Sequence, residues 1–301
     1  MSSTISEDKF IRQEPVKELI EWVQSEEERS VVIDGLYSSA KAFAISASAR
    51  EGLHIILLNN REDAVYCSGD LYKLVDKERV VFCPPSKNYS LRNVSKDSSH
   101  LVQRTAAINA VREFTEGISP FENIFLIGYP HSVTEPVINK KSLSSSILKI
   151  SKGNTLSHEF IKETLIEYGF ERVDFVAEPG QFALRGGLID LFSYSDNRPW
   201  RIDFFGDTVE KIKVFDIETQ RSLQELDSVE IFPDIHETDN IPVEDIFTFS
   251  NDCATVWITD EEYFSSQIKL IDQHRGEQEN IIGYEQLFKK LSEQKRALFA
   301  P

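Results

Sequence analysis

The chain has 301 residues, of which 41% are hydrophobic and 28% are charged, and its formal net charge is −17. This length allows about two or three domains of about 100–150 residues, with enough chain to bury a sizeable core. A strongly acidic chain is repelled by phosphates, which argues against non-specific binding of nucleic acid by the chain as a whole.

Thiols, histidines and the N-terminus carry little functional signal. The cysteines, Cys67, Cys83 and Cys253, have no CxxC spacing and no histidine at metal-ligand spacing, so reduced thiols and no metal site are expected. No Ser-His-Asp or Cys-His arrangement can be argued from spacing, so no catalytic residues are assigned. The N-terminal segment is polar, and no apolar stretch approaches the roughly 20 residues that span a bilayer. A soluble cytoplasmic protein with no membrane partner is expected.

Two kinds of segment alternate along residues 1–130. Helical apolar spacing or an alanine-rich composition favours helices in four segments, 10–24, 40–49, 62–75 and 101–114. Short apolar runs typical of buried strands lie between them, at 31–34, 54–58, 79–83 and 123–128. Continuous apolar strands that alternate with helices indicate a parallel sheet of the α/β class.

The composition changes near Pro130, after which a serine-rich stretch precedes another helix. Ser157 is a suitable N-cap for this helix, which is expected to run to Tyr168 with Gly169 at its end. Several short strands joined by tight turns are expected from Tyr168 to Pro233.

The chain beyond Pro233 is acidic and irregular at first. Residues 254–258 then form an apolar run typical of a buried strand, and 261–274 and 284–298 are expected to be helical. These segments look like a return to the first domain. A middle module inserted into a parallel α/β domain explains both the change in composition and the late strand.

The strand-rich run is punctuated by four arginines, Arg172, Arg185, Arg198 and Arg201. Alternation with a period of two places the apolar side chains of Trp200–Phe204 on one face and Arg201 and Asp203 on the other. Arg185 points outward from its own strand, and Gly186–Gly187 permits a bulge or a close backbone approach. Asp190 is a candidate partner for a neighbouring arginine.

Two interpretations of this arginine-bearing sheet stay open on composition alone. In the first, it is a solvated sheet face with surface ion pairs, each worth about 0–1 kcal/mol. In the second, it is a protein-binding surface on which arginines act as hot spots beside exposed aromatic side chains such as Phe192 or Phe205.

Residues 35–42 have the position of a phosphate-binding loop, because they follow an expected strand and open an expected helix. Gly35 and Lys41 are in register with the pattern GxxxxGK[ST]. Ala40 stands in place of the second glycine, and its Cβ disfavours the left-handed backbone that such a loop often uses. Ala42 stands in place of Ser or Thr, which removes a direct Mg²⁺ ligand. The loop is expected not to support ATP hydrolysis.

The strand-rich run resembles the middle domain of the UvrB homology module. The resemblance rests on EPGQFALRGGLIDLF at 178–192, RIDFFGD at 201–207 and FDIETQRS at 215–222. The first and third of these are closer to the bacterial transcription-repair coupling factors, the Mfd family, than to UvrB itself. The match is specific over about 168–233 and colinear over 10–130.

The resemblance implies a fold. A degenerate P-loop domain of the helicase type, α/β in class, is split into parts 1A and 1B, with an α+β domain 2 inserted between them. The corresponding boundaries are 1–130 for domain 1A, 131–234 for domain 2 and 235–301 for domain 1B.

The resemblance also implies a task. Proteins of the Mfd family remove RNA polymerase stalled at DNA damage and recruit the excision machinery, and their UvrB-like N-terminal module docks on UvrA. This chain would be that module, a fragment that is not itself an enzyme and needs no cofactor. The ATP-dependent DNA translocase motor, with its ATP and Mg²⁺, and the contacts to RNA polymerase and DNA lie further along the family's chain. Another domain would cover the docking surface until polymerase is engaged.

Carried over from the family, the UvrA-contacting residues are Arg172, Arg185 and Arg201, with Asp203 as the acidic neighbour and Phe192 as an aromatic contact. Ala183 replaces a further arginine of UvrB, so one contact of UvrB is expected to be missing. The hairpin with which UvrB probes damaged DNA is expected near Pro84–Ser99. Tyr89 is the only aromatic residue in that short stretch, so damage verification is not expected.

Two other functions stay open at this point. One is an ATP-hydrolysing helicase-like domain built on residues 35–42. The other is a genuine UvrB-type protein that binds damaged DNA.

Overall fold

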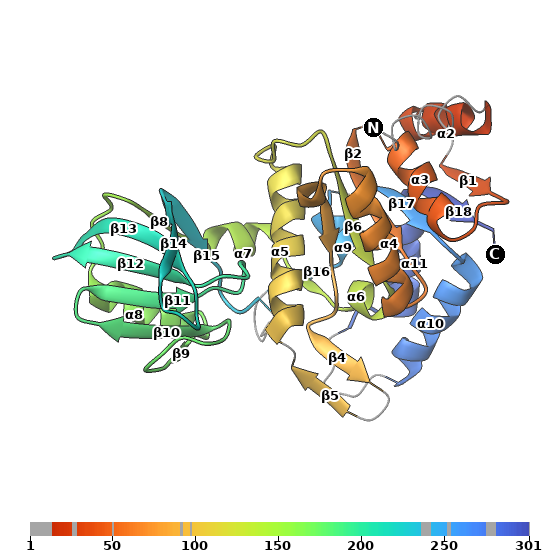
Figure 1. Ribbon diagram of the computed structural model, residues 1–301. Helices are drawn as coiled ribbons and strands as arrows, with labels where there is room; N and C mark the ends of the chain where they lie inside the picture. The colour runs from red at the N-terminus through yellow and green to blue at the C-terminus, as the bar shows by residue number, and fades with distance from the viewer. Residues whose placement is uncertain are drawn as a thin grey trace. The chain divides into compact units, whose positions relative to one another are not determined.

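The structure is a computed structural model that describes residues 14–25, 29–49, 51–90, 93–96, 98–235, 242–251, 254–274 and 281–300. Within residues 88–98 only the backbone is described. The chain divides into two compact units. Unit 1 comprises Met1–Tyr89, Ala107–Val137 and Glu244–Pro301, and unit 2 comprises Ser90–Ala106 and Ile138–Val243 (Figure 1).

A parallel sheet forms the centre of unit 1 in the described part of the chain. Its strands lie in the order β1-β18-β17-β2-β6-β3, and each neighbouring pair is parallel. The strand bounds are β1 Ser30–Ile33, β2 Gly52–Leu57, β3 Val80–Phe82, β6 Asn123–Gly128, β17 Thr255–Ile258 and β18 Lys295–Phe299. The α/β class with a parallel sheet, predicted from alternating apolar strands and helices, is confirmed.

Helices connect these strands. Their bounds are α2 Glu14–Gln24, α3 Ser39–Ser48, α4 Arg61–Leu74, the 3-10 helix η1 Lys77–Arg79, α6 Pro130–Thr134, α9 Ile246–Phe249, α10 Glu261–His274 and α11 Tyr284–Glu293. Helix α5, Ser98–Thr115, has residues in both units. Among the residues that the structure describes, no helix has the length and hydropathy needed to cross a bilayer.

A histidine lies inside the sheet of unit 1. His54, on the central strand β2, is fully buried and accepts a hydrogen bond at Nδ1 from Trp257 Nε1 at 3.2 Å. Its ring stacks on Phe125, with centroids 5.5 Å apart. Burial, together with the nearby charge of Arg79, lowers the pKa of His54 to about 3. This histidine is therefore neutral in the folded protein at neutral pH.

The expectation of a buried strand at 31–34 is wrong. β1 is an edge strand of the sheet, and Val32 is 68% exposed. A short apolar run reads the same in an edge strand and in a buried one, since only the neighbouring strands decide its burial.

The expectation of one helix over 284–298 is also wrong at its end. Helix α11 ends at Glu293, and residues 295–299 form β18, which pairs with β1 on one side and β17 on the other. Ala297 and Phe299 are buried there, at 0% and 2% exposure. Sheet pairing and this burial outweigh the helix propensity of the local sequence.

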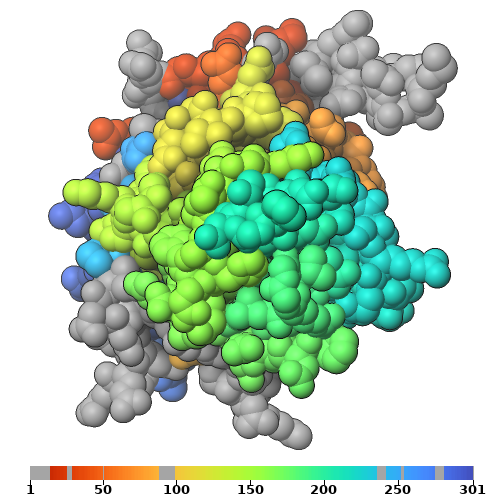
Figure 2. Space-filling model, turned by 90° about the vertical axis from the view of Figure 1, so that its left-hand side faces the viewer, coloured from red at the N-terminus to blue at the C-terminus, as the bar shows by residue number. Residues whose placement is uncertain are grey.

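Unit 2 is built on a second sheet. Its order is β14-β13-β12-β11-β10-β9, antiparallel except for the parallel pair of β9 with β10. The bounds are β9 Glu171–Arg172, β10 Gln181–Arg185, β11 Leu188–Phe192, β12 Trp200–Phe205, β13 Thr208–Phe215 and β14 Ser222–Leu226. Part of this unit's surface, green to cyan, faces the viewer in Figure 2.

Helix α8, His158–Glu167, packs against one face of this sheet. The Ser157 side chain caps it by accepting a hydrogen bond from Phe160 N at 3.1 Å, as predicted. Ile161 and Leu165 are buried in the core of the unit. Phe160, an apolar residue of the same helix, is 46% exposed. The buried stripe of α8 is therefore narrower than its sequence pattern.

The remaining elements are short. Helix α7 is Lys140–Ser145, and three two-stranded sheets pair β15 Ser228–Ile231 with β8 Leu148–Ser151, β16 Val243–Glu244 with β7 Val137–Ile138, and β4 Lys87–Ser90 with β5 Asn93–Lys96. The strands β4 and β5 lie in the stretch near Pro84–Ser99 where the counterpart of the UvrB hairpin was expected. Residues 91–92 and the side chain of Tyr89 lie outside the described part of the chain.

Candidate protein-docking surface

The two faces of the unit 2 sheet differ in chemistry. Ile189, Ile202 and Ile212 pair across β11, β12 and β13, and Phe182 of β10 pairs with Leu191 of β11. All five side chains are 0–1% exposed, so they form the core face. The residues that alternate with them face the other way. We call this second face the arginine face, and its charged residues are Glu171, Arg185, Asp190, Arg201, Asp203, Lys211, Lys213 and Glu225.

Strand register assembles the arginine face from residues distant in sequence. One row runs Ala183, Asp190, Arg201, Lys213 and Glu225, and the next runs Arg185, Leu188, Asp203 and Lys211. With Glu171, which pairs with Gln181, the face carries four cationic side chains and four carboxylates. Its charges therefore balance, although the chain as a whole has a net charge of −17. The predicted sharing of one face by Arg201 and Asp203 is confirmed.

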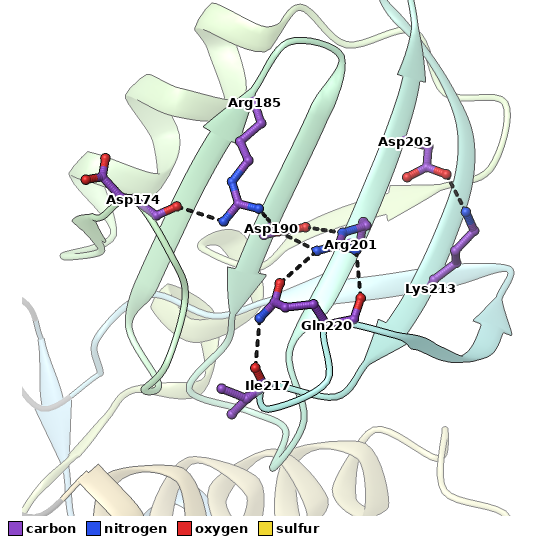
Figure 3. Close-up of polar contacts among 8 residues, drawn as sticks. All are labelled: Asp174, Arg185, Asp190, Arg201, Asp203, Lys213, Ile217 and Gln220. Atoms are coloured by element: carbon purple, nitrogen blue, oxygen red, sulfur yellow. Dashed lines mark hydrogen bonds and ion pairs between the residues drawn. The ribbon is translucent and has the colours of Figure 1, made fainter.

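Arg201 is held inside a network on this face (Figure 3). Its Nε donates to Asp190 Oδ1 at 2.6 Å and its Nη2 donates to Asp190 Oδ2 at 2.8 Å, a bidentate pair. Nη1 and Nη2 also donate to the backbone and side-chain oxygens of Gln220, at 3.3 and 3.2 Å. The guanidinium carbon lies 4.6 Å from the centroid of the Phe215 ring. The predicted pairing of Asp190 with an arginine is confirmed.

The side chains of the Arg201–Asp190 pair are largely buried, which indicates that the pair stabilises the fold. The side chain of Arg201 is 16% exposed and that of Asp190 is 3% exposed. The hydrogen bonds to Asp190, helped by the charges of Asp190 and Asp203, outweigh burial and raise the pKa of Arg201 above its ordinary value. The guanidinium of Arg201 is thus committed to partners within the unit.

Arg185 is the more accessible arginine of this face. Its side chain is 35% exposed, and its Nη1 lies 3.8 Å from Asp190 Oδ2. Its Nη2 donates to the backbone oxygen of Asp174 at 2.7 Å. Its guanidinium carbon lies 4.3 Å from the centroid of the Phe175 ring, a cation–π arrangement.

Asp203 is paired with a lysine of the next strand. Lys213 Nζ lies 2.5 Å from Asp203 Oδ2, and the two side chains are 22% and 18% exposed. Asp203 Oδ1 is buried, with no hydrogen-bond partner in the described part of the chain. Asp203 is therefore an internal counter-charge of the arginine face.

The expectation that Phe192 is an exposed aromatic is wrong. Phe192 is 6% exposed and packs with Val176, Ala183 and Phe215 in a small apolar cluster on the arginine-face side. The segment between β9 and β10 supplies Val176 and so covers part of this face. Phe205, the other aromatic residue that was expected to be exposed, is 81% exposed.

The strand register places Arg172 on a different face of the sheet from Arg185 and Arg201. Both residues of β9 are exposed, and Arg172 pairs with Phe182, whose side chain lies in the core. Paired residues share a face, so Arg172 lies at the sheet edge on the opposite face from Arg185 and Arg201.

The glycine pair after Arg185 has the predicted role of a close backbone approach. Phe204 N donates to Gly187 O at 2.8 Å. A Cβ at position 187 would lie 2.9 Å from the Phe204 backbone oxygen, closer than side-chain atoms are normally found. Gly186 has φ of 59°, in the left-handed region. The turn therefore brings the end of β12 against the end of the β10–β11 hairpin.

Residues 35–42, predicted to be a degenerate phosphate loop, lie in unit 1 after β1 and extend into the start of α3. Gly35 has φ of 75°, and the next left-handed residue is Ser38, with φ of 50°. Ala40 lies within α3, so the backbone strain expected at that position is absent. Ala40 N donates to Tyr37 O at 3.1 Å and Lys41 N donates to Ser38 O at 3.2 Å. Two backbone N–H groups of the loop are therefore bonded within the loop.

A cavity of about 280 Å³ adjoins this loop and includes Lys41 and Ala42 in its lining. The same lining contains the carboxylates of Asp63 and Asp70 and the Cys67 thiol, whose pKa burial raises to about 12. Two carboxylates against one lysine disfavour a polyphosphate. Among the described residues, no cluster of histidine, cysteine or carboxylate side chains is placed to hold a metal ion.

Two residues of the docking surface were missed by sequence reasoning. Phe175 lies in a loop, and its exposure and its contact with Arg185 have no periodic signal. Gln220 is left-handed, with φ of 58°, and holds Arg201 through its backbone and side-chain oxygens. The run FDIETQRS contains Gln220, so the motif could have indicated it but not its partner.

The family model described as the UvrB interaction domain matches residues 148–236. This range runs from the start of β8 past the end of β15 and includes every strand of the arginine face. The arginine face thus lies within the segment that matches the UvrB interaction domain. The resemblance found in the arginine-bearing run is confirmed.

The chain is similar to transcription-repair-coupling factors and to a UvrABC system protein B. The chain is 29% identical over 204 residues to that of Bacillus subtilis (strain 168), which is 67% of this chain and 17% of the relative. It is 38% identical over 104 residues to that of Escherichia coli (strain K12), which is 34% of this chain and 9% of the relative. The UvrABC system protein B of Streptococcus sanguinis (strain SK36) is 33% identical over 101 residues, 33% of this chain and 15% of that protein. The chain spans less than a fifth of these relatives.

Proposed function

We propose that this chain is the N-terminal docking module of a transcription-repair coupling factor. In this role it binds UvrA and recruits nucleotide excision repair to RNA polymerase stalled at DNA lesions. The observation that carries the proposal is the coincidence of the UvrB interaction domain match with the arginine face, on which Arg185 is partly exposed.

We assign different tasks to the residues carried over from the family. Arg185 is the direct contact to the partner, because it is partly exposed and keeps donors that its contacts with Asp174 and Asp190 do not use. Arg201 and Asp203 act through the fold by holding neighbouring strands in place. Arg172 contributes only where the interface extends round the β9 edge. Phe192 supports the sheet from within its apolar cluster.

Replacement of Arg185 by alanine is expected to weaken UvrA binding about 30-fold or more, because truncating an arginine hot spot commonly costs about 2 kcal/mol or more. The unfolding transition of the variant should remain that of the wild type, since the side chain is 35% exposed. Calorimetric titration of purified UvrA with the 301-residue chain measures the affinity.

Arg198→Ala is the matched control for this experiment. Arg198 belongs to the same unit, its side chain is 52% exposed, and its Nε lies 4.0 Å from Asp196 Oδ1, at the edge of ion-pair distance. Its variant should bind UvrA like the wild type. Equal affinities for Arg185→Ala and the wild type would remove Arg185 from the proposed interface.

We further propose that the chain needs no cofactor and neither hydrolyses ATP nor probes damaged DNA. Support comes from the absence of a Ser or Thr hydroxyl at Ala42, from the loop-bonded N–H groups of Ala40 and Lys41, and from the carboxylates in the adjoining cavity. The rival is an ATP-hydrolysing helicase-like domain.

A phosphate-release assay on the 301-residue chain is expected to give no turnover, and Lys41→Ala is expected to leave that background unchanged. Lys41 is the one residue of the loop able to reach the outer phosphates in the usual arrangement. Turnover that Lys41→Ala abolishes would contradict the proposal and favour the rival.

The rest of the task is assigned to a longer protein. We propose that its ATP-dependent translocase motor and its contacts to RNA polymerase and DNA lie outside this chain, and that one of its domains covers the arginine face until polymerase is engaged. We keep domain 1A at 1–130, domain 2 at 131–234 and domain 1B at 235–301 as the proposed boundaries. The alternative of a UvrB-type damage-binding protein predicts salt-dependent binding to damaged duplex DNA.

A further inference from the structure

A large apolar side chain lies exposed beside the accessible arginine of the docking surface. Phe175 is 66% exposed. Its ring lies under the Arg185 guanidinium, whose carbon is 4.3 Å from the ring centroid. The residue before it, Asp174, accepts the Nη2 hydrogen bond of Arg185 through its backbone oxygen. One short loop segment thus contacts Arg185 at both the flat face and the edge of the guanidinium.

These contacts fix the orientation of a side chain that is otherwise among the most flexible. An arginine loses rotamer freedom when it is immobilised at an interface, and this loss opposes binding. The Phe175 ring, the Asp174 oxygen and the Asp190 carboxylate, 3.8 Å away, already restrict Arg185 in the free protein. The cost of ordering Arg185 on binding is therefore reduced before the partner arrives.

The chemistry of the surface defines its partner. Arg185 is an accessible cation on the arginine face, with a side chain that is 35% exposed, so its guanidinium attracts a carboxylate of the partner. The exposed ring of Phe175 gains most from apolar contact next to that acidic group. Phe205, 81% exposed, extends the apolar border, because the Gly187–Phe204 hydrogen bond holds the end of β12 beside the turn after Arg185.

We propose that Phe175 and Arg185 form one recognition unit, in which the ring orients the guanidinium and itself packs on the partner. The unit takes a carboxylate side chain bordered by apolar surface. This inference rests on the proposed function, so the partner is UvrA. It adds Phe175, which belongs to none of the residues carried over from the family, as a specificity-determining contact.

Phe175→Ala is expected to weaken UvrA binding by about tenfold or more, as truncation of an aromatic hot spot does. Phe160→Ala is the matched control, because Phe160 is a 46% exposed phenylalanine of the same unit on helix α8, which packs on the other face of the sheet. Thermal melts should show unchanged folding in both variants.

A double-mutant cycle tests whether the two side chains act as one unit. The Phe175→Ala/Arg185→Ala variant should lose less affinity than the product of the two single losses. Arg185→Lys should bind nearly as weakly as Arg185→Ala, because lysine keeps the charge but lacks the planar group that stacks on the ring.

The outcomes separate the two proposals. No binding of UvrA by the wild-type chain would overturn both. If the wild type binds UvrA and Phe175→Ala binds it as tightly as Phe160→Ala does, this inference alone is overturned. It is also overturned if the two single losses of affinity multiply in the double mutant, or if Arg185→Lys binds UvrA as tightly as the wild type. A tenfold or larger loss for Phe175→Ala together with sub-multiplicative losses would establish the unit.

Discussion

Arg201→Ala is expected to destabilise unit 2 by about 3–5 kcal/mol, because it leaves the Asp190 carboxylate, 3% exposed, without its bidentate partner. The same change removes both hydrogen bonds to Gln220 and so releases the turn that precedes β14. For a unit of this size the melting temperature should fall by on the order of 10–20 °C. Thermal unfolding followed by circular dichroism measures this loss.

Two further variants test whether the loss of stability comes from the broken Arg201–Asp190 pair. Arg198→Ala removes an exposed arginine of the same unit and should change stability by less than about 0.5 kcal/mol. Asp190→Ala/Arg201→Ala removes both charges and should cost less than the sum of the two single losses, because no unpaired carboxylate remains buried. A melting temperature of Arg201→Ala within 2–4 °C of the wild type, about 1 kcal/mol or less, would contradict the structural role of this pair.

This result bears on how UvrA-binding data are read. A loss of binding in Arg201→Ala would reflect a disturbed sheet, whereas a loss in Arg185→Ala would reflect a missing contact. Measuring stability beside affinity separates the two, and the structure predicts opposite patterns for these two arginines.

Acidification is expected to destabilise unit 1 through His54. Its pKa is about 3 in the folded protein against 6.5 as the ordinary value, which we take for the unfolded chain. Between these values the unfolded chain binds a proton that the folded chain does not. The stability that His54 contributes is therefore complete above about pH 6.5 and is lost as pH falls towards 3, at up to about 1.4 kcal/mol per pH unit. Urea unfolding at pH 7.5, 6.0 and 5.0 measures the slope.

His54→Gln is the matched variant for this measurement. Glutamine keeps an oxygen that can accept the hydrogen bond of Trp257 Nε1, but it does not titrate. Its free energy of unfolding should therefore vary less with pH than that of the wild type, and the difference between the two slopes isolates His54 from the carboxylates. Parallel pH profiles for the two proteins would show that His54 is not the cause.

The local alternation of residues was enough to predict which side chains share a face of the sheet in unit 2. Alternation along Trp200–Phe204 predicted that Arg201 and Asp203 share a face, and the structure agrees. Phe192 was expected to be an exposed aromatic residue beside the arginines, but it is 6% exposed. Val176 and Phe215 cover Phe192 from a loop and a different strand, and such contacts have no signature in the sequence around it.

The sequence by itself determined the α/β class, the positions of most helices and strands, and the arginine-bearing run, because periodicity and turn residues are local properties. Only the tertiary structure decided that residues 295–299 form a strand, that Arg201 is committed to Asp190 and Gln220, and that Arg185 stacks on Phe175. The physical reason is that burial and pairing depend on what neighbouring strands and loops bring to a residue. Two arginines of one run therefore differ in exposure, 16% for Arg201 and 35% for Arg185, because different strands and loops surround them.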